Sequence, residues 1–164
     1  IVCVISGPEP QRSILERELM RLLPAIPGEH LIVRGMPGPV PDERRGHVRS
    51  IGHLADDALT GALLGADLIV GRTGYSTVMD LERIGRTALL VPTPGQPEQE
   101  YLGRLHKDNG RFIVQVQGEL DIAAALESRV AGTRIPTTRD SGERQLDVAM
   151  KELAGLLPGR CSGT

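Results

Sequence analysis

The sequence has very few aromatic residues, with no Trp, one Phe and two Tyr among 164 residues. Proteins that bind single-stranded nucleic acid stack bases on aromatic side chains, and this chain offers almost none. It also lacks a basic excess, because 19 Lys and Arg stand against 21 Asp and Glu and give a net charge of −2. Binding to duplex nucleic acid relies on such an excess. The composition therefore argues against a nucleic-acid partner.

Cysteines and metal-ligating patterns are scarce as well. Cys3 and Cys161 form neither a CxxC pair nor a disulfide framework, and the four histidines show no zinc-ligand spacing. The longest apolar runs, residues 1–5 and 88–91, are far shorter than the roughly 20 residues that a bilayer span requires. We expect a cytoplasmic chain that folds without metal or disulfides.

The remaining composition is typical of one globular domain, with 40% hydrophobic and 24% charged residues. We expect that domain to cover residues 1–157 and to be followed by a flexible tail over 158–164. The sequence opens directly on a strand pattern at Ile1, without an initiator Met or a leader. This start predicts a piece of a longer protein whose N-terminal domain is absent from the chain.

Short apolar runs alternate with helical patterns along the chain, which indicates an α/β fold with a parallel sheet. The stretch 35–46 is rich in Pro and Gly and is expected to be irregular. Asp56 or Asp57 is expected to cap the helix that follows the third strand. The predicted fold is a Rossmann-like parallel sheet of about six strands with helices on both faces. Strands are predicted at residues 1–5, 30–34, 48–52, 67–70, 87–91 and 111–116, and helices at 11–23, 56–65, 75–84, 98–107, 119–130 and 142–157.

The loop after the first strand, Ser-Gly-Pro-Glu-Pro, leads into a helix. Free amides and the positive end of the helix dipole favour anions at such a place. The GxGxxG pattern of dinucleotide-binding proteins is absent, which argues against a dehydrogenase. A tight turn without a ligand is the alternative for this loop.

The loop after the fourth strand, Gly-Arg-Thr-Gly-Tyr-Ser-Thr, also opens a helix and has small residues that let an anion approach the backbone. Arg72, Ser76 and Thr77 supply further donors, a pattern that suits a diphosphate. Asp80 lies one turn deeper and can accept hydrogen bonds from ribose hydroxyls. In the alternative interpretation, Thr73 caps the helix and Asp80 only complements the helix dipole.

The loop after the fifth strand contains three prolines and ends at Gln99 and Glu100 on a predicted helix. Amides and carboxylates offer the donors and acceptors that sugar hydroxyls require. A solvated helix start is the alternative for these two residues. His53 lies near the same edge of the sheet, where a single histidine is more typical of an ordinary loop.

Two motifs carry a family resemblance. Residues 66–81 run from Ala-Asp-Leu-Ile-Val-Gly-Arg-Thr-Gly to Asp-Leu. They resemble a motif in which a strand is followed by an (R)SG-x-x-T turn and then by a Glu or Asp in the next helix. Residues 90–101 are similar in position to a VP…QQ-x-x-N region. Over roughly residues 1–126 the sequence thereby resembles the C-terminal, nucleotide-sugar-binding half of family 28 glycosyltransferases of the GT-B fold. That group contains the GlcNAc transferase of peptidoglycan lipid synthesis.

The resemblance implies a role for each matched position. Amides of the helix that starts at Gly74 would contact the donor diphosphate, and Asp80 would hold the ribose. Gln99 and Glu100 would bind the donor sugar, although Glu100 is an acid where the family has an amide. By this resemblance, the matched positions would contact uracil, ribose, phosphate or sugar. They are Ser6, Gly7, His53, Leu54, Arg72, Thr73, Gly74, Tyr75, Ser76, Thr77, Asp80, Gln99 and Glu100.

The resemblance also implies an inverting transfer of a hexosyl group from a UDP-sugar such as UDP-GlcNAc, without cofactor or obligatory metal. Arg72 and the helix dipole would stabilise the leaving diphosphate. The catalytic base and the binding of a lipid-linked or saccharide acceptor would belong to the N-terminal domain of the same polypeptide. That domain would also bring the protein to the inner membrane, and the isolated chain is expected to be inactive.

Two other classes of function stay open. A sugar-nucleotide epimerase or hydrolase would need an acid or base at the anomeric carbon, for which Glu100 and His53 are the candidates. A non-catalytic α/β interaction module would bind no nucleotide, and its polar loops would be incidental.

Overall fold

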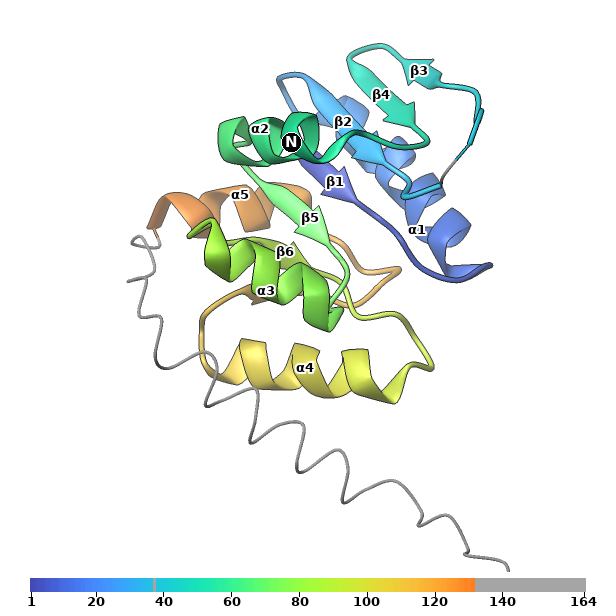
Figure 1. Cartoon of the computed structure of the whole chain (residues 1–164). Helices are drawn as coiled ribbons and strands as arrows, with labels where there is room; N and C mark the ends of the chain where they lie inside the picture. Colours follow the sequence, from blue (N-terminus) through green and yellow to red (C-terminus); the bar gives the residue numbers. More distant parts are fainter. Residues whose placement is uncertain (37, 132–164) are drawn as a thin grey trace, which may run out of the picture.

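A computed structural model of the chain describes residues 1–36 and 38–131, which form an α/β domain around one sheet (Figure 1). The predicted helix at 142–157, the tail at 158–164 and Cys161 lie outside the described residues. The strands are β1 Val2–Val4, β2 His30–Val33, β3 Glu43–Arg45, β4 Val48–Ile51, β5 Ile69–Gly71, β6 Leu89–Leu90 and β7 Ile113–Val114. The helices are α1 Gln11–Leu22, the short 3-10 helix η1 Leu23–Ala25, α2 Asp56–Gly65, α3 Tyr75–Arg83, α4 Pro97–Asp108 and α5 Ile122–Ala131.

The seven strands lie in the order β3-β4-β2-β1-β5-β6-β7. All neighbours pair in parallel except β3, which is antiparallel to β4. The chain starts in the middle of the sheet at β1, runs outward to β3, and returns to place β5 on the other side of β1. This reversal makes the β1/β5 boundary the topological switch point, where open α/β sheets bind their ligands beyond the carboxyl ends of the strands.

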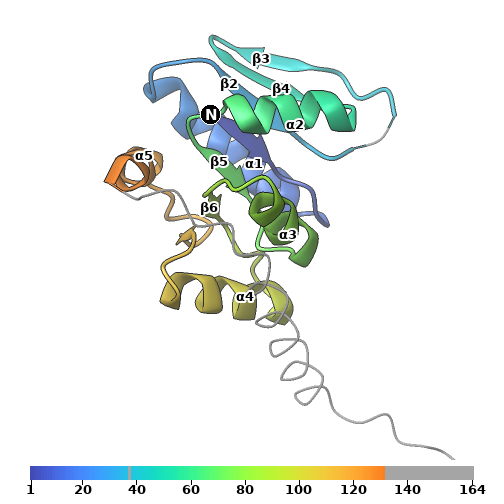
Figure 2. The same cartoon turned by 60° about the vertical axis from the view of Figure 1, so that its left-hand side comes forward.

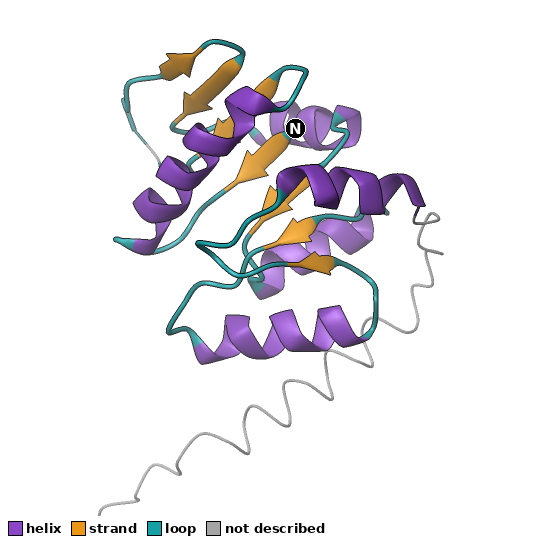
Figure 3. Ribbon diagram, turned by 180° about the vertical axis from the view of Figure 1, so that it is seen from behind, coloured by secondary structure: helices purple, strands orange, loops and turns teal. Residues whose placement is uncertain are grey.

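Helices cover both faces of the sheet, which confirms the predicted fold class. Alternate residues of β1 point to opposite faces, so Cys3 joins one core cluster and Val2 the other. The first cluster packs under α1 and α5, which lie in front of the sheet in Figure 3. The second packs under α2 and α3, which lie on the opposite side in Figure 2. Among the helices of the described residues, none has the length and apolar character that crossing a bilayer requires.

The expectation that residues 35–46 are irregular is wrong for their last part. Glu43–Arg45 forms β3, which pairs with β4 across a tight turn at Gly46, whose φ of 60° lies in the left-handed region. The three residues of β3 are all exposed and charged, so the alternation of apolar and polar residues that signals a strand is missing. Such charges are typical of an edge strand that is protected against pairing with other chains. The sheet therefore has seven strands rather than about six.

Candidate functional site

The loops after β1 and β5 lie side by side at the switch point. Val4 pairs with Gly71, so the chain leaves the sheet at Ile5 and at Arg72 from neighbouring positions. Five helices begin at this carboxyl edge, because α1, α2, α3, α4 and α5 follow β1, β4, β5, β6 and β7. At the start of α5, Asp121 Oδ1 already accepts a hydrogen bond from Ala124 N at 2.9 Å. Each helix start presents backbone amides without intrahelical partners and the positive end of the dipole. The starts of α1, α2, α3 and α4 are therefore the candidate sites for a negative charge.

The start of α1 already holds a carboxylate from its own loop. The Glu9 side chain accepts hydrogen bonds from Ser13 N at 3.2 Å and from Ser13 Oγ at 2.9 Å, and it also pairs with Arg12. The hydrogen bond from Arg12, together with those from Ser13, holds the pKa of the Glu9 carboxyl below its usual value. Ser6 and Gly7 precede it and are exposed. An anion at α1 would have to displace Glu9 or bind beside it.

The starts of α2 and α4 also carry acidic residues. Asp56 and Asp57 lie in the first turn of α2, but the expected cap is wrong, because the N-cap is Ala55 and no side chain caps this helix. Glu98 and Glu100 lie in the first turn of α4. The negative charges complement both dipoles and disfavour an incoming anion.

The start of α3 differs from the other three. Its N-cap is Gly74, its first turn contains no acidic residue, and no side chain caps it. Tyr75 and Ser76 are exposed, and the first helical hydrogen bond of the turn runs from Val78 N to Gly74 O at 3.0 Å. The amides of residues 75–77 therefore stay available to a ligand. Asp80 is exposed one turn further along the same helix.

Thr73 does not cap α3, so this part of the alternative interpretation is wrong, while the role of Asp80 stays a prediction. Its side chain is completely buried, and its Oγ1 donates a hydrogen bond to the backbone carbonyl of Gln99 at 2.8 Å. The hydroxyl thereby joins the β5–α3 loop to the first turn of α4.

Arg72 is buried, with an exposed fraction of 3%, and its guanidinium is directed at backbone carbonyls. Nη2 donates to Gln11 O at 2.7 Å, and Nη1 donates to Val91 O at 3.3 Å and to Pro92 O at 3.5 Å. Burial lowers the pKa of Arg72 to about 10, with an opposing contribution from Glu18. The side chain stays charged at neutral pH. Its predicted contact with a leaving diphosphate remains a prediction.

Gln99 uses both ends of its side-chain amide within the loop before α4. Its Oε1 accepts hydrogen bonds from Thr93 N at 3.1 Å and Thr93 Oγ1 at 2.9 Å. Its Nε2 donates to Gln96 Oε1 at 2.6 Å. Gln96, which the sequence analysis did not single out, therefore shares this position with Gln99.

Glu100 is turned toward a different part of the molecule. Its Oε1 accepts a hydrogen bond from Gly95 N at 2.9 Å, and the residue lines a cavity of about 330 Å³ beside α4 and β7. Consecutive helical residues project about 100° apart, so Gln99 and Glu100 face different surroundings. The cavity is lined by Pro92, Pro94, Glu100, Gly103, Arg104, Lys107, Val114, Gln115 and Val116.

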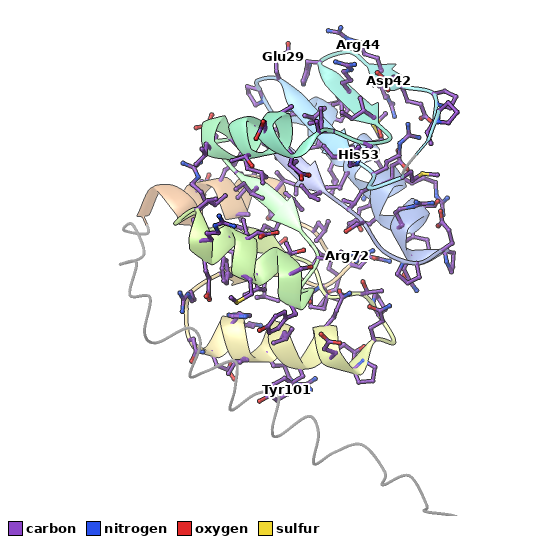
Figure 4. The ribbon with its side chains drawn as sticks, viewed as in Figure 1. Glu29, Asp42, Arg44, His53, Arg72 and Tyr101 are labelled. Atoms are coloured by element: carbon purple, nitrogen blue, oxygen red, sulfur yellow. The ribbon has the colours of Figure 1, made fainter. Side chains whose placement is uncertain are left out.

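His53 and Leu54 lie farther from α3 than the other predicted residues. They follow β4, which is separated from β5 by β2 and β1, so the strand spacing gives about 14 Å between the two ends. His53 is exposed and Leu54 is half-buried. His53 and Arg72 follow the carboxyl ends of their strands, as Figure 4 indicates. A single ligand would need to extend across the switch point to contact both loops.

Two features of this edge were missed by the sequence analysis. Glu9 lies two residues before α1, and an acid at that distance from a helix start is a signal that could have revealed it. Gln96 had no comparable signal, because its partner is another side chain in the loop. Within residues 1–36 and 38–131, no group of three His, Cys, Asp or Glu side chains is placed to hold a metal ion.

Comparison with known proteins shows which family this domain resembles. The fold is a Rossmann-like α/β domain with one open helix start at its switch point. Residues 55–133 match the model described as "Glycosyltransferase family 28 C-terminal domain". Over these residues, which make up just under half of the chain, the sequence is similar to this family. The matched region contains the starts of α2, α3 and α4 but not the loop after β1.

Curated relatives show a similarity of the same kind. A protein of Methylorubrum extorquens is 50% identical over 64 residues, which cover 39% of this chain and 16% of the relative. A protein of Bradyrhizobium diazoefficiens is 28% identical over 93% of this chain and 48% of the relative, and one of Nitrobacter hamburgensis is 33% identical over 57% and 29%. Each is named "UDP-N-acetylglucosamine--N-acetylmuramyl-(pentapeptide) pyrophosphoryl-undecaprenol N-acetylglucosamine transferase". The chain spans about half the length of these relatives or less.

Proposed function

We propose that this chain is the donor-binding domain of a glycosyltransferase and that it binds a UDP-sugar, such as UDP-GlcNAc, at the carboxyl edge of the β1/β5 boundary. The whole protein would transfer the hexosyl group with inversion to an acceptor held by a further, N-terminal domain. A lipid-linked acceptor is in keeping with the names of the relatives. The whole protein would then work at the cytoplasmic side of a membrane to which it binds peripherally.

The observation that carries this proposal is the open start of α3. Glu9 occupies the start of α1, and α2 and α4 have acids in their first turns, whereas α3 has no acid and no side-chain cap. The buried guanidinium of Arg72 lies in the adjoining loop and adds positive potential. A diphosphate carries the charge that this position favours.

The other parts of the donor follow from this placement. Asp80 would accept hydrogen bonds from the ribose, and the loop at His53 and Leu54 would contact the base across the switch point. The sugar, on the distal phosphate, would lie toward the start of α4. There Gln96 and Gln99 form one connected amide pair, while Glu100 would contribute from the side of α4 that lines the cavity.

Calorimetric titration of the chain with UDP, UDP-GlcNAc, UDP-glucose, GDP and ADP tests the proposal. We expect heat and thermal stabilisation with the uridine compounds and weaker effects with the purine ones. Absence of any binding would overturn the proposal and favour the interaction module. Hydrolysis or epimerisation of a UDP-sugar without acceptor would instead favour the epimerase or hydrolase.

Asp80→Asn is expected to weaken UDP binding by about 1–3 kcal/mol, because a neutral amide replaces a charged acceptor of the ribose hydroxyls. Titration with UDP measures this loss. The matched control is Asp57→Asn, which makes the same change in the first turn of α2 and should leave UDP affinity unchanged. Equal affinities of the parent and Asp80→Asn would assign Asp80 to the helix alone.

A further inference from the structure

Arg72 and Thr73 occupy the two positions between the end of β5 and the N-cap of α3. We propose that they are positioning residues, which fix the start of α3 relative to the starts of α1 and α4. They would thereby set the distance between the diphosphate-binding and sugar-binding parts of the site. This inference rests on the proposed function and adds the residues that hold the two parts of the site in register.

Thr73 connects the β5–α3 loop to the first turn of α4 through one hydrogen bond. Its hydroxyl donates to the Gln99 carbonyl, and the side chain of the same Gln99 holds Thr93 and Gln96. The hydrogen bonds form a continuous path from the β5–α3 loop to the loop before α4. A shift of Thr73 would therefore move the amide groups that we place near the sugar.

Arg72 connects the same loop to two other segments. Its guanidinium reaches the first residue of α1 through Gln11 O and the end of β6 through Val91 O. Gln11 also accepts a hydrogen bond from Gln117 through its side chain, at 2.7 Å, which extends the path toward the segment before α5. Among the described residues, no carboxylate forms a salt bridge with Arg72. The buried cation is therefore held by backbone carbonyls from loops far apart in the sequence.

The burial of Thr73 and Arg72 favours a positioning role over direct contact with a ligand. Thr73 is fully buried and Arg72 nearly so, whereas Tyr75 and Ser76 at the start of α3 are exposed. A UDP-sugar would contact α3 through its diphosphate and α4 through its sugar at the same time. Its affinity relative to that of UDP therefore depends on how rigidly the two helix starts are spaced. UDP itself contacts only the first of them.

Thr73→Val tests the inference, because it keeps the shape of the side chain and removes the donor to Gln99 O. We expect the ratio of UDP-GlcNAc to UDP affinity, measured by calorimetry on the chain, to fall about tenfold. Affinity for UDP alone should change by no more than about threefold. Thr73→Ser keeps the hydroxyl and should restore the ratio. Thr60→Val, at an exposed position of α2, is the matched control and should leave both affinities unchanged.

Arg72→Lys provides a second variant in case Thr73→Val does not fold, which circular dichroism would reveal. Lysine keeps the charge but not the planar fork that reaches two loops at once, so the same drop in the ratio is expected. Equal losses for UDP and UDP-GlcNAc would show a merely structural role and overturn the inference. An unchanged ratio would overturn it too. If the parent chain binds neither UDP nor UDP-GlcNAc, the proposed function itself is overturned. If the parent binds both with equal affinity, the proposed sugar contacts and this inference are overturned, and the proposed UDP site remains.

Discussion

Ser76→Asp is expected to weaken UDP binding by at least about 30-fold, while the chain stays folded and becomes slightly more stable. The substitution gives α3 an acid like those that already lie at the starts of α1, α2 and α4. A carboxylate near a helix start stabilises the helix by about 0.3–1 kcal/mol. The same charge would repel a diphosphate and occupy its amides, at a cost on the order of 2 kcal/mol or more in binding. Titration with UDP and thermal unfolding measure the two opposite effects.

Ser76→Asn is the control, because it has nearly the shape of Asp but no charge. We expect it to keep UDP affinity within a few-fold of the parent and to leave the melting temperature nearly unchanged. If Ser76→Asp binds UDP as tightly as the parent, the diphosphate does not lie at the start of α3.

Acidification is expected to destabilise the chain through His106 in α4. The side chain is 6% exposed and contacts Phe112 edge-on, and neither ring nitrogen has a hydrogen-bond partner among the described residues. Burial, with a smaller contribution from Arg111, lowers the pKa of His106 to about 4. The unfolded chain takes up this proton near pH 6.5, so stability falls as the pH drops from about 6.5 to 4. The free energy of unfolding should fall by about 2–3 kcal/mol over this range.

Urea unfolding at pH 7, 5.5 and 4 measures this loss in the parent and in His106→Leu. The variant has no imidazole at this position and should lose about 2–3 kcal/mol less between pH 7 and 4. Burial also lowers the pKa of His30, but that contribution is common to both proteins and cancels in the comparison. The control His53→Asn removes an exposed imidazole and keeps His106. It should lose as much free energy of unfolding between pH 7 and 4 as the parent does. Parallel curves for the parent and His106→Leu would contradict the prediction.

The order of helices and strands in the described residues could be predicted because each buried element has its own periodic pattern. β1 and β5 are short apolar runs, and α1 repeats apolar residues at helical spacing, so local sequence was sufficient for them. β3 could not be predicted in this way, because its stability comes from pairing with β4 and its three side chains are all charged and exposed. A strand that buries no side chain leaves no hydrophobic pattern in the sequence.

For the candidate site, the sequence predicted that the loop after β5 opens a helix, which the structure confirms, but it did not predict the partners of each side chain. The roles of Arg72 and Thr73 depend on backbone carbonyls at Gln11, Val91 and Gln99. Every residue has a carbonyl, so such partners leave no trace in residue type or spacing. The same applies to Gln99, whose amide pattern suggested a sugar contact but whose side chain also holds its own loop.

The Glu9 carboxylate at the start of α1 has a consequence for the entropy of binding. Three hydrogen bonds to Arg12 and Ser13 tie the loop after β1 to its helix without a ligand. A loop that is already ordered loses little conformational freedom when a neighbouring site fills. The Glu9 carboxylate thus takes the place of an anion at one helix start, and this half of the switch point is ordered before any ligand binds.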